Sequence, residues 1–259
     1  MAHRRTVDRM ATSTIEVVWA TEVGQRHGEN QDSCVAIPED GLFVVSDGMG
    51  GEHAGDVASS MVVEWAPRLV ARHLKHAEGY NARALELALR GAVVELNHRV
   101  REESSQLEGA ARMGATVVLA LVRGESLHVA HMGDSRAYCW ASGGLTRLTD
   151  DHSVAAVLAR RGALTPEQAA CHPMRTRLSR YVGMGGNAYP DLRTVRFGPR
   201  QRLLLCTDGL TEAVPDDAIA RLLGAETDLE AVCNSLVDEA EAGESPDNVT
   251  AMVVERKPV

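Results

Sequence analysis

Hydrophobic and polar positions alternate along the chain in two distinct periods. Short runs of β-branched and apolar residues are typical of strands, and tight turns such as 123–125 join several of these runs. The predicted strands are 14–22, 33–37, 42–46, 115–122, 126–132, 136–141, 193–197, 202–207 and 248–255. Because short connections join successive strands, we expect these strands to pair in the antiparallel sense.

Three longer stretches carry apolar residues at the helical spacing of i, i+3, i+4 and i+7. They begin near Ala54, Leu85 and Leu229, and a shorter helix is predicted over about 151–161. Strands and helices are clustered along the chain and do not alternate strictly. This order favours an α+β fold with an antiparallel sheet core and helices outside.

The domain organisation is predicted to be simple. Residues 1–13 are basic and polar, and we expect a flexible tail there. Residues 14–259 contain no linker or repeat, so they are expected to form a single domain. The stretch from about 150 to 191 is rich in Gly, Pro and Arg, and it is predicted to be a flap inserted over one edge of the sheets.

Composition narrows the class of protein. Hydrophobic residues make up 44% of the 259 residues and aromatic residues only 3%, so the predicted core is aliphatic. The net charge of -9 argues against nucleic-acid binding. No apolar run reaches the ~18 residues of a membrane span, and no signal peptide is apparent. Five cysteines without a Cys-x-x-Cys pair predict free thiols in a reducing cytosol. We therefore expect a soluble, cytoplasmic protein, with a monomer as the default.

Carboxylates fall at the boundaries of several predicted strands. Asp47, Asp134 and Asp208 follow strands, whereas Asp32 and Asp247 precede them. In an antiparallel sheet the end of one strand and the start of its neighbour share a rim. All five side chains can therefore meet at one edge, and Glu212, one helical turn after Asp208, can join them.

The negative charges of such a cluster of carboxylates must be offset. Asp also favours turns for local reasons, which explains any one of these residues but explains the set less well. Two like charges ~4 Å apart at a protein surface repel by about 4 kcal/mol, so the cluster must recruit cations or shift its pKa values. Oxygen-only ligands select Mg²⁺ or Mn²⁺. Gly48 has no Cβ, so its carbonyl can also approach an ion.

Seven motifs in order resemble the metal-dependent Ser/Thr phosphatases of the PPM family, also called protein phosphatase 2C. They are GQRHGENQDS, VVSDGMGGEHAGDVAS, GATVVLALV, VAHMGDSRAY, LTDDHS, LLLCTDGLTE and SPDNVTAMVV, and the resemblance covers about residues 14–256. It implies an α-β-β-α sandwich of two antiparallel sheets flanked by helices. It also implies hydrolysis of phosphoserine and phosphothreonine by a hydroxide that bridges two metal ions. Phosphorylated proteins, especially those of a partner Ser/Thr kinase, are the substrates that the family implies.

The resemblance assigns roles to the carboxylates by matched position. Asp47 would bridge two Mn²⁺ or Mg²⁺ ions, and the Gly48 carbonyl would bind one of them. Asp208 and Asp247 would complete the shell of the second ion, so Asp47, Asp208 and Asp247 are the catalytic residues expected. Asp32 would support the pair, mostly through water. A third, weaker metal site would use Asp134, Asp208 and Glu212.

The first motif departs from the family pattern at the position that usually holds a phosphate-binding Arg. His27 stands there, and Arg26 precedes it. A protonated His27 can bind phosphate with pH dependence, Arg26 is the second candidate, and a site that uses neither is the third. Gln31 replaces the usual Glu before Asp32, and it can still hold a metal-bound water.

The same residues argue against two other functions. A dinucleotide site would need Gly at the position of His53, and Asp47 would repel the pyrophosphate. A haloacid-dehalogenase phosphatase would need a second Asp at the position of Met49. The remaining alternative is a catalytically silent member of the same fold that binds or senses phosphoproteins; the complete set of metal-binding acids argues against it.

Overall fold

Two antiparallel sheets pack face to face in the computed structural model, which describes residues 5–24, 28–50, 54–76, 81–106, 113–142, 144–186 and 188–258. The first sheet has the order β1 (Arg5–Ala11), β2 (Ile15–Glu22), β12 (Val249–Arg256), β11 (Arg202–Cys206), β8 (Arg136–Ala141) and β9 (Gly144–Arg147). The second has the order β10 (Asp191–Arg196), β7 (Ser126–Met132), β6 (Val117–Arg123), β4 (Leu42–Met49) and β3 (Asp32–Ile37), with β5 (Gly114–Ala115) paired to the end of β4.

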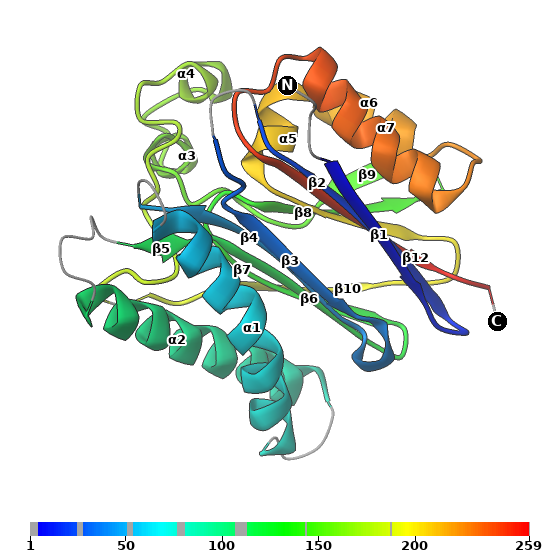
Figure 1. Ribbon diagram of the computed structural model, residues 1–259, viewed down its shortest axis with the longest axis horizontal. Helices are drawn as coiled ribbons and strands as arrows, with labels where there is room; N and C mark the ends of the chain where they lie inside the picture. The colour runs from blue at the N-terminus through cyan, green and yellow to red at the C-terminus, as the bar shows by residue number, and fades with distance from the viewer. Residues whose placement is uncertain are drawn as a thin grey trace.

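Helices cover both outer faces of this sandwich (Figure 1). The long helices α1 (Ala54–Lys75) and α2 (Ala82–Gln106) pack on the second sheet. On the first sheet lie α5 (Asp208–Ala213), α6 (Asp216–Leu223) and α7 (Leu229–Ala242). Two short helices, α3 (Val154–Arg160) and α4 (Pro166–Ala170), belong to the segment between β9 and β10. The α+β fold and the predicted sandwich of two antiparallel sheets are confirmed.

An aliphatic core fills the space between the two sheets, as the composition predicted. The inner face of the first sheet contributes Val17 and Leu205, and that of the second contributes Val45 and Val118, all fully buried. Phe43 is one of the few aromatic residues among them. This alternation of inward and outward residues is what period-two patterning demands of a strand buried on a shared face.

The N-terminal residues differ from expectation. A flexible tail was expected over residues 1–13, but residues Arg5–Ala11 form β1, which pairs along its full length with β2. Arg5 forms ion pairs with Glu22 (2.8 Å), Asp238 (2.6 Å) and Glu241 (3.0 Å), and Val7 packs against the neighbouring core cluster. The charge of Arg5, which contributed to the expectation of a tail, is therefore paired with residues distant in the sequence.

Two further sequence predictions concern covalent and membrane features. All five cysteines are free, and Cys139, Cys206 and Cys233 are buried. No helix in the described parts of the chain combines the length and the apolar composition that a bilayer-spanning segment requires.

Candidate active site

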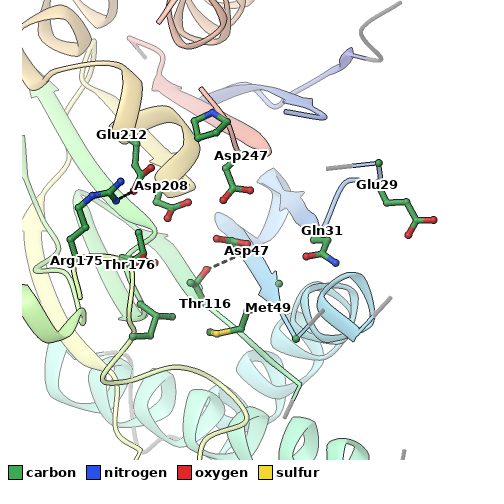
Figure 2. A pocket seen from close by; sticks show the side chains of 16 residues that line it. Glu29, Gln31, Asp47, Met49, Thr116, Arg175, Thr176, Asp208, Glu212 and Asp247 are labelled. Carbon is green, nitrogen blue, oxygen red and sulfur yellow. Dashed lines mark hydrogen bonds and ion pairs between the residues drawn. The ribbon is translucent and has the colours of Figure 1, made fainter. Parts of the chain in front are cut away.

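One rim of the sandwich is hollowed into a cavity of about 900 Å³. Its described lining includes six carboxylates, contributed by loops and element ends far apart in the sequence: Glu29, Asp47, Asp134, Asp208, Glu212 and Asp247. Figure 2 shows the carboxylates of Asp47, Asp208 and Asp247 turned toward a shared space. The prediction that acids from distant strand ends meet at one rim is therefore correct in its geometry.

Strand register places the first two of the predicted ligands. Asp32 at the start of β3 pairs directly with Asp47 near the end of β4. Asp32 is not part of the cavity lining; it is buried behind it, with 8% of its surface exposed. The next residue of β4, Gly48, lies against the start of α1, where a Cβ would come within 1.8 Å of the Gly55 carbonyl oxygen. Glycine at position 48 therefore lets α1 approach the strand end that carries Asp47.

Hydroxyl groups hold the Asp47 backbone in place. The Asp47 N–H donates to Thr116 Oγ1 (2.8 Å), and the Thr116 N–H donates to the Asp47 carbonyl (2.8 Å). Thr116 Oγ1 also contacts Ser135 Oγ at 2.6 Å, next to Asp134. Gly133 adopts φ +118°, and a Cβ there would collide with Thr116 at 2.6 Å. Thr116 was not predicted as a site residue, although it lies within the predicted strand 115–122; it joins β5 to β6.

Burial and mutual repulsion make these carboxylates costly to ionise. Burial raises the pKa of Asp47 well above its ordinary value, and the neighbouring Asp208 raises it further. Burial also raises the pKa of Asp208 well above its ordinary value, with Asp134 and Asp247 adding to the effect. The pKa of Asp134 is raised to about 7, by burial first and then by Asp151. Like charges crowded in a low-dielectric rim have this effect unless cations are present.

Two buried carboxylate oxygens at the site have no hydrogen-bond partner among the described residues, which suits the binding of divalent cations. Asp32 Oδ1 and Asp208 Oδ1 are buried and have no hydrogen-bond partner among the described residues. Buried carboxylate oxygens are rarely left in this state. The described lining contains no histidine or cysteine, so the donors are oxygens, which suit Mg²⁺ and Mn²⁺. The residues present therefore fit the metal ions that the sequence analysis expected.

One cation faces the acids from the segment between β9 and β10. Arg175 Nη1 lies 2.6 Å from Glu212 Oε1, and this ion pair joins the segment to α5 at one edge of the cavity (Figure 2). Among the described lining residues Arg175 is the only cationic side chain. Thr176 and Leu178 line the cavity beside it. The predicted ligand Glu212 is thus at the site, but it is paired with an arginine.

The expected phosphate-binding residues cannot be placed. Arg26 and His27 lie outside the described residues, as does His53. Gln31 does line the cavity, and its backbone N–H donates to Asn248 Oδ1 at 2.9 Å. This bond fastens the first motif to the last one, next to Asp247.

A second polar cluster lies at the base of the same segment. The rings of His131 and His152 stack with centroids 4.5 Å apart, and His152 Nε2 lies 3.1 Å from Asp191 Oδ2. These three residues are close enough to suggest a metal site. However, the Gly133 N–H donates to His152 Nδ1 (3.2 Å), so Nε2 carries the ring proton and donates to Asp191. Both ring nitrogens of His152 are occupied, which indicates a structural role for this histidine.

Comparison with known proteins agrees with this architecture. The family model for protein phosphatase 2C matches residues 24–246. The serine/threonine phosphatase stp of Listeria welshimeri is 35% identical over 219 residues, covering 83% of this chain and 84% of that protein. The crystal structure of the serine/threonine phosphatase Stp1 from Staphylococcus aureus is 32% identical, with a TM-score of 0.82 over 93% of this chain and 95% of that one.

A third comparison bears on metals. The catalytic domain of the serine/threonine protein phosphatase PstP, solved in complex with two manganese ions, is 29% identical and has a TM-score of 0.75. It covers 98% of this chain and 100% of that one. The chain belongs to the protein phosphatase 2C family. It is an enzyme of this metal-dependent class of serine/threonine phosphatases, as the motifs predicted.

Proposed function

We propose that this enzyme removes phosphate from phosphoserine and phosphothreonine in proteins, in a reaction that depends on Mn²⁺ or Mg²⁺. The observation that carries the proposal is the charge of the cavity: six carboxylates face one arginine among the described lining residues. A phosphate dianion cannot enter such a cavity while the acids stay uncompensated. Divalent cations would reverse the sign of the site and allow phosphate to bind.

The proposed division of labour follows the matched motifs. Asp47, with the Gly48 carbonyl, Asp208 and Asp247 would hold two cations, and Asp32 would act on them from behind the lining. Asp134, Asp208 and Glu212 would hold a third, weaker one. The last assignment requires Glu212 to leave Arg175, whose ion pair is partly exposed and therefore weak, about 0–1 kcal/mol.

The chemistry would need no covalent enzyme intermediate. Bound divalent cations supply Lewis-acid chemistry: they lower the pKa of a water nucleophile and offset charge on the phosphoryl oxygens. The protein supplies position. Thr116 fixes the backbone of Asp47 through two hydrogen bonds, and Gly48 gives α1 room to approach the strand end. The described lining offers neither cysteine nor histidine as a nucleophile.

Substrate recognition is proposed to involve the segment 150–191 as a flap over the cavity. Arg175 projects from this segment into the lining, where it would meet the phosphate or acidic residues of the substrate once it leaves Glu212. His27 or Arg26 would provide the second contact to phosphate, as the first motif predicts. We further propose that the substrates are those of a partner Ser/Thr kinase and that the enzyme works in the cytosol, which its five free cysteines favour. A monomer is the default proposal for its oligomeric state.

The test is hydrolysis of p-nitrophenyl phosphate and of a phosphothreonine peptide by metal-stripped protein with and without Mn²⁺. We expect activity only with the cation. Asp208→Asn should lower kcat/KM by about a thousand-fold or more, because it removes a charged ligand shared by the proposed sites. Asp217→Asn, on the exposed first turn of α6, is the matched control and should leave kcat/KM unchanged.

Two outcomes would contradict the proposal. Equal rates with Mn²⁺ and with chelator would remove the cation from the mechanism. Wild-type rates no higher than those of Asp208→Asn would favour the catalytically silent alternative, in which the same cavity only binds phosphoproteins.

A further inference from the structure

One oxygen of the Asp32 carboxylate is held by two buried hydroxyl groups. Asp32 Oδ2 accepts hydrogen bonds from Thr207 Oγ1 at 2.9 Å and from Thr250 Oγ1 at 2.7 Å. Both threonines are fully buried. The other oxygen, Oδ1, is buried as well and has no hydrogen-bond partner among the described residues. The two oxygens of one carboxylate therefore have opposite surroundings.

Thr207 does not cap the helix that it precedes, and its hydroxyl binds Asp32 instead. It occupies the N-cap position of α5, where a threonine side chain usually accepts a bond from the helix backbone, but its hydroxyl makes no such bond. Instead the hydroxyl accepts the Thr250 N–H at 3.0 Å and donates to Asp32. A cap bond typically stabilises a helix by about 1 kcal/mol. Thr207 does not make this bond, so its hydroxyl contributes to the contact with Asp32 and not to capping. Local rules are broken in this manner mostly at functional sites.

Thr250 receives its orientation from a chain of donors that can run in only one direction. Asn30 Oδ1 accepts the Asp32 N–H (3.0 Å), so its Nδ2 is the atom that faces Thr21 Oγ1 (2.7 Å). Each hydroxyl has one proton to donate. Because Thr250 gives its proton to Asp32, the 2.8 Å contact between Thr21 and Thr250 must have Thr21 as the donor. The chain therefore runs from Asn30 through Thr21 and Thr250 to Asp32.

We propose that Thr207 and Thr250 are positioning residues for the cation site: they occupy Asp32 Oδ2, so that Oδ1 alone is left to act on the bound cations or their waters. The inference rests on the proposed function, because it assumes that cations bind at this rim. Asp32 pairs in register with Asp47, so the two residues occupy neighbouring strand positions, and Asp47 is one of the residues that would hold the cations. A free carboxylate could rotate and present either oxygen; two fixed donors remove that freedom. Hydrogen bonds to groups behind metal ligands commonly change metal affinity by 10–100-fold.

The test measures Mn²⁺ affinity directly, by calorimetry and by manganese electron paramagnetic resonance, on metal-stripped protein without substrate. Thr207→Val and Thr250→Val keep the shape but remove one donor each, and each should weaken Mn²⁺ binding about ten-fold. Thr207→Ser and Thr250→Ser restore the hydroxyl and should bind within about three-fold of wild type. If the two threonines only filled space, the serine variants would not bind Mn²⁺ more tightly than the valine variants, because valine matches the shape of threonine better.

Thr149→Val is the matched control. Thr149 is equally buried, at 3% exposed, and its hydroxyl accepts the Ala137 N–H at 3.1 Å, outside the chain of donors to Asp32. Its substitution should lower stability without changing Mn²⁺ affinity. Thr21→Val is the milder variant for the case in which a valine at 207 or 250 prevents folding. It keeps both donors to Asp32, removes the donor to Thr250, and should weaken binding about three-fold.

The outcomes separate the inference from the function on which it rests. If wild-type protein bound no Mn²⁺, the proposed function would fail. If wild type bound Mn²⁺ and folded Thr207→Val and Thr250→Val bound it equally well, or if Thr21→Val replaced them and had no effect, the positioning role would be overturned. Valine and serine variants that weaken binding alike would also overturn it.

Discussion

Two buried polar clusters lie near one another in this molecule, and they differ in how completely they are satisfied. At the rim, Asp32 Oδ1 and Asp208 Oδ1 have no partner among the described residues, and burial raises the pKa of both carboxyl groups. At the base of the segment 150–191, His152 has partners on both ring nitrogens, and His131 Nε2 donates to the Asp150 carbonyl at 2.9 Å.

The difference separates a site for a ligand from a structural support. A cluster with unpaired buried oxygens is stable only when something else completes it, whereas a fully paired cluster stabilises the fold by itself. Residue types alone do not separate the two clusters, because two histidines and an aspartate can also form a metal site. The two clusters are distinguished by whether their buried polar atoms have hydrogen-bond partners. Three predictions test this contrast.

The largest effect is expected at His152, which joins the Gly133 turn to β10. His152→Leu would leave the Gly133 N–H without its acceptor and remove the contact to Asp191, at a cost of about 3 kcal/mol in the free energy of unfolding. Urea denaturation in chelator measures it. The control is His172→Leu in the same segment, where the lost bond to the Met174 N–H is exposed and the cost should stay below about 1 kcal/mol. An equal loss of unfolding free energy in His152→Leu and His172→Leu would contradict the structural role of His152.

A pH effect of intermediate size is expected from His131. Burial, and then His152, lower the pKa of His131 to about 4 from the ordinary 6.5. Below 6.5 the unfolded chain therefore binds a proton that the folded protein does not, so stability falls with decreasing pH until about pH 4. Between pH 7.5 and 5 the loss attributable to His131 should be about 2 kcal/mol. His131→Asn should show a shallower decline in parallel urea titrations, and identical slopes would contradict the assignment.

The smallest effect is expected at the rim, and its sign is opposite. In metal-free protein near pH 7, Asp208→Asn relieves a buried like-charge cost and should raise the free energy of unfolding by about 1 kcal/mol. With Mn²⁺ at about 100 times its Kd, wild type gains about 2.7 kcal/mol and the order reverses. Denaturation with chelator and with Mn²⁺ measures both. A variant less stable than wild type in chelator would show that the rim, like the histidine cluster, is complete without a cation.

Much of the fold could be predicted because its strands are regular. Each predicted apolar run corresponds to a strand, from β2 to β12, since period-two patterning reflects burial directly. β1 was missed because its seven residues include three charged ones whose partners cannot be known without the fold. β9 and α6 were missed for a similar reason: short elements carry too few residues for a period to stand out.

Some residues of the site could be predicted from the sequence and others could not. Asp47, Asp134, Asp208 and Asp247 were predicted because each stands at a strand boundary, and the alternation of strand directions brings such boundaries to one rim. The threonines behind Asp32 were not predicted. Thr207 and Thr250 are 175 and 218 residues away from Asp32, and no local pattern distinguishes a threonine that positions a ligand from one that fills a strand.

The amino-acid sequence by itself determined the antiparallel strands, the aliphatic core and the acids at one rim, because periodicity and strand-end chemistry act over a few neighbouring residues; its motifs, by their resemblance to a family, implied the sandwich. Only the tertiary structure decided which oxygen of Asp32 has no partner among the described residues, that Arg175 faces Glu212, and that His152 has a hydrogen-bond partner on each ring nitrogen. Those outcomes depend on which hydrogen-bond partners a buried group meets, and the partners come from segments that only folding brings together.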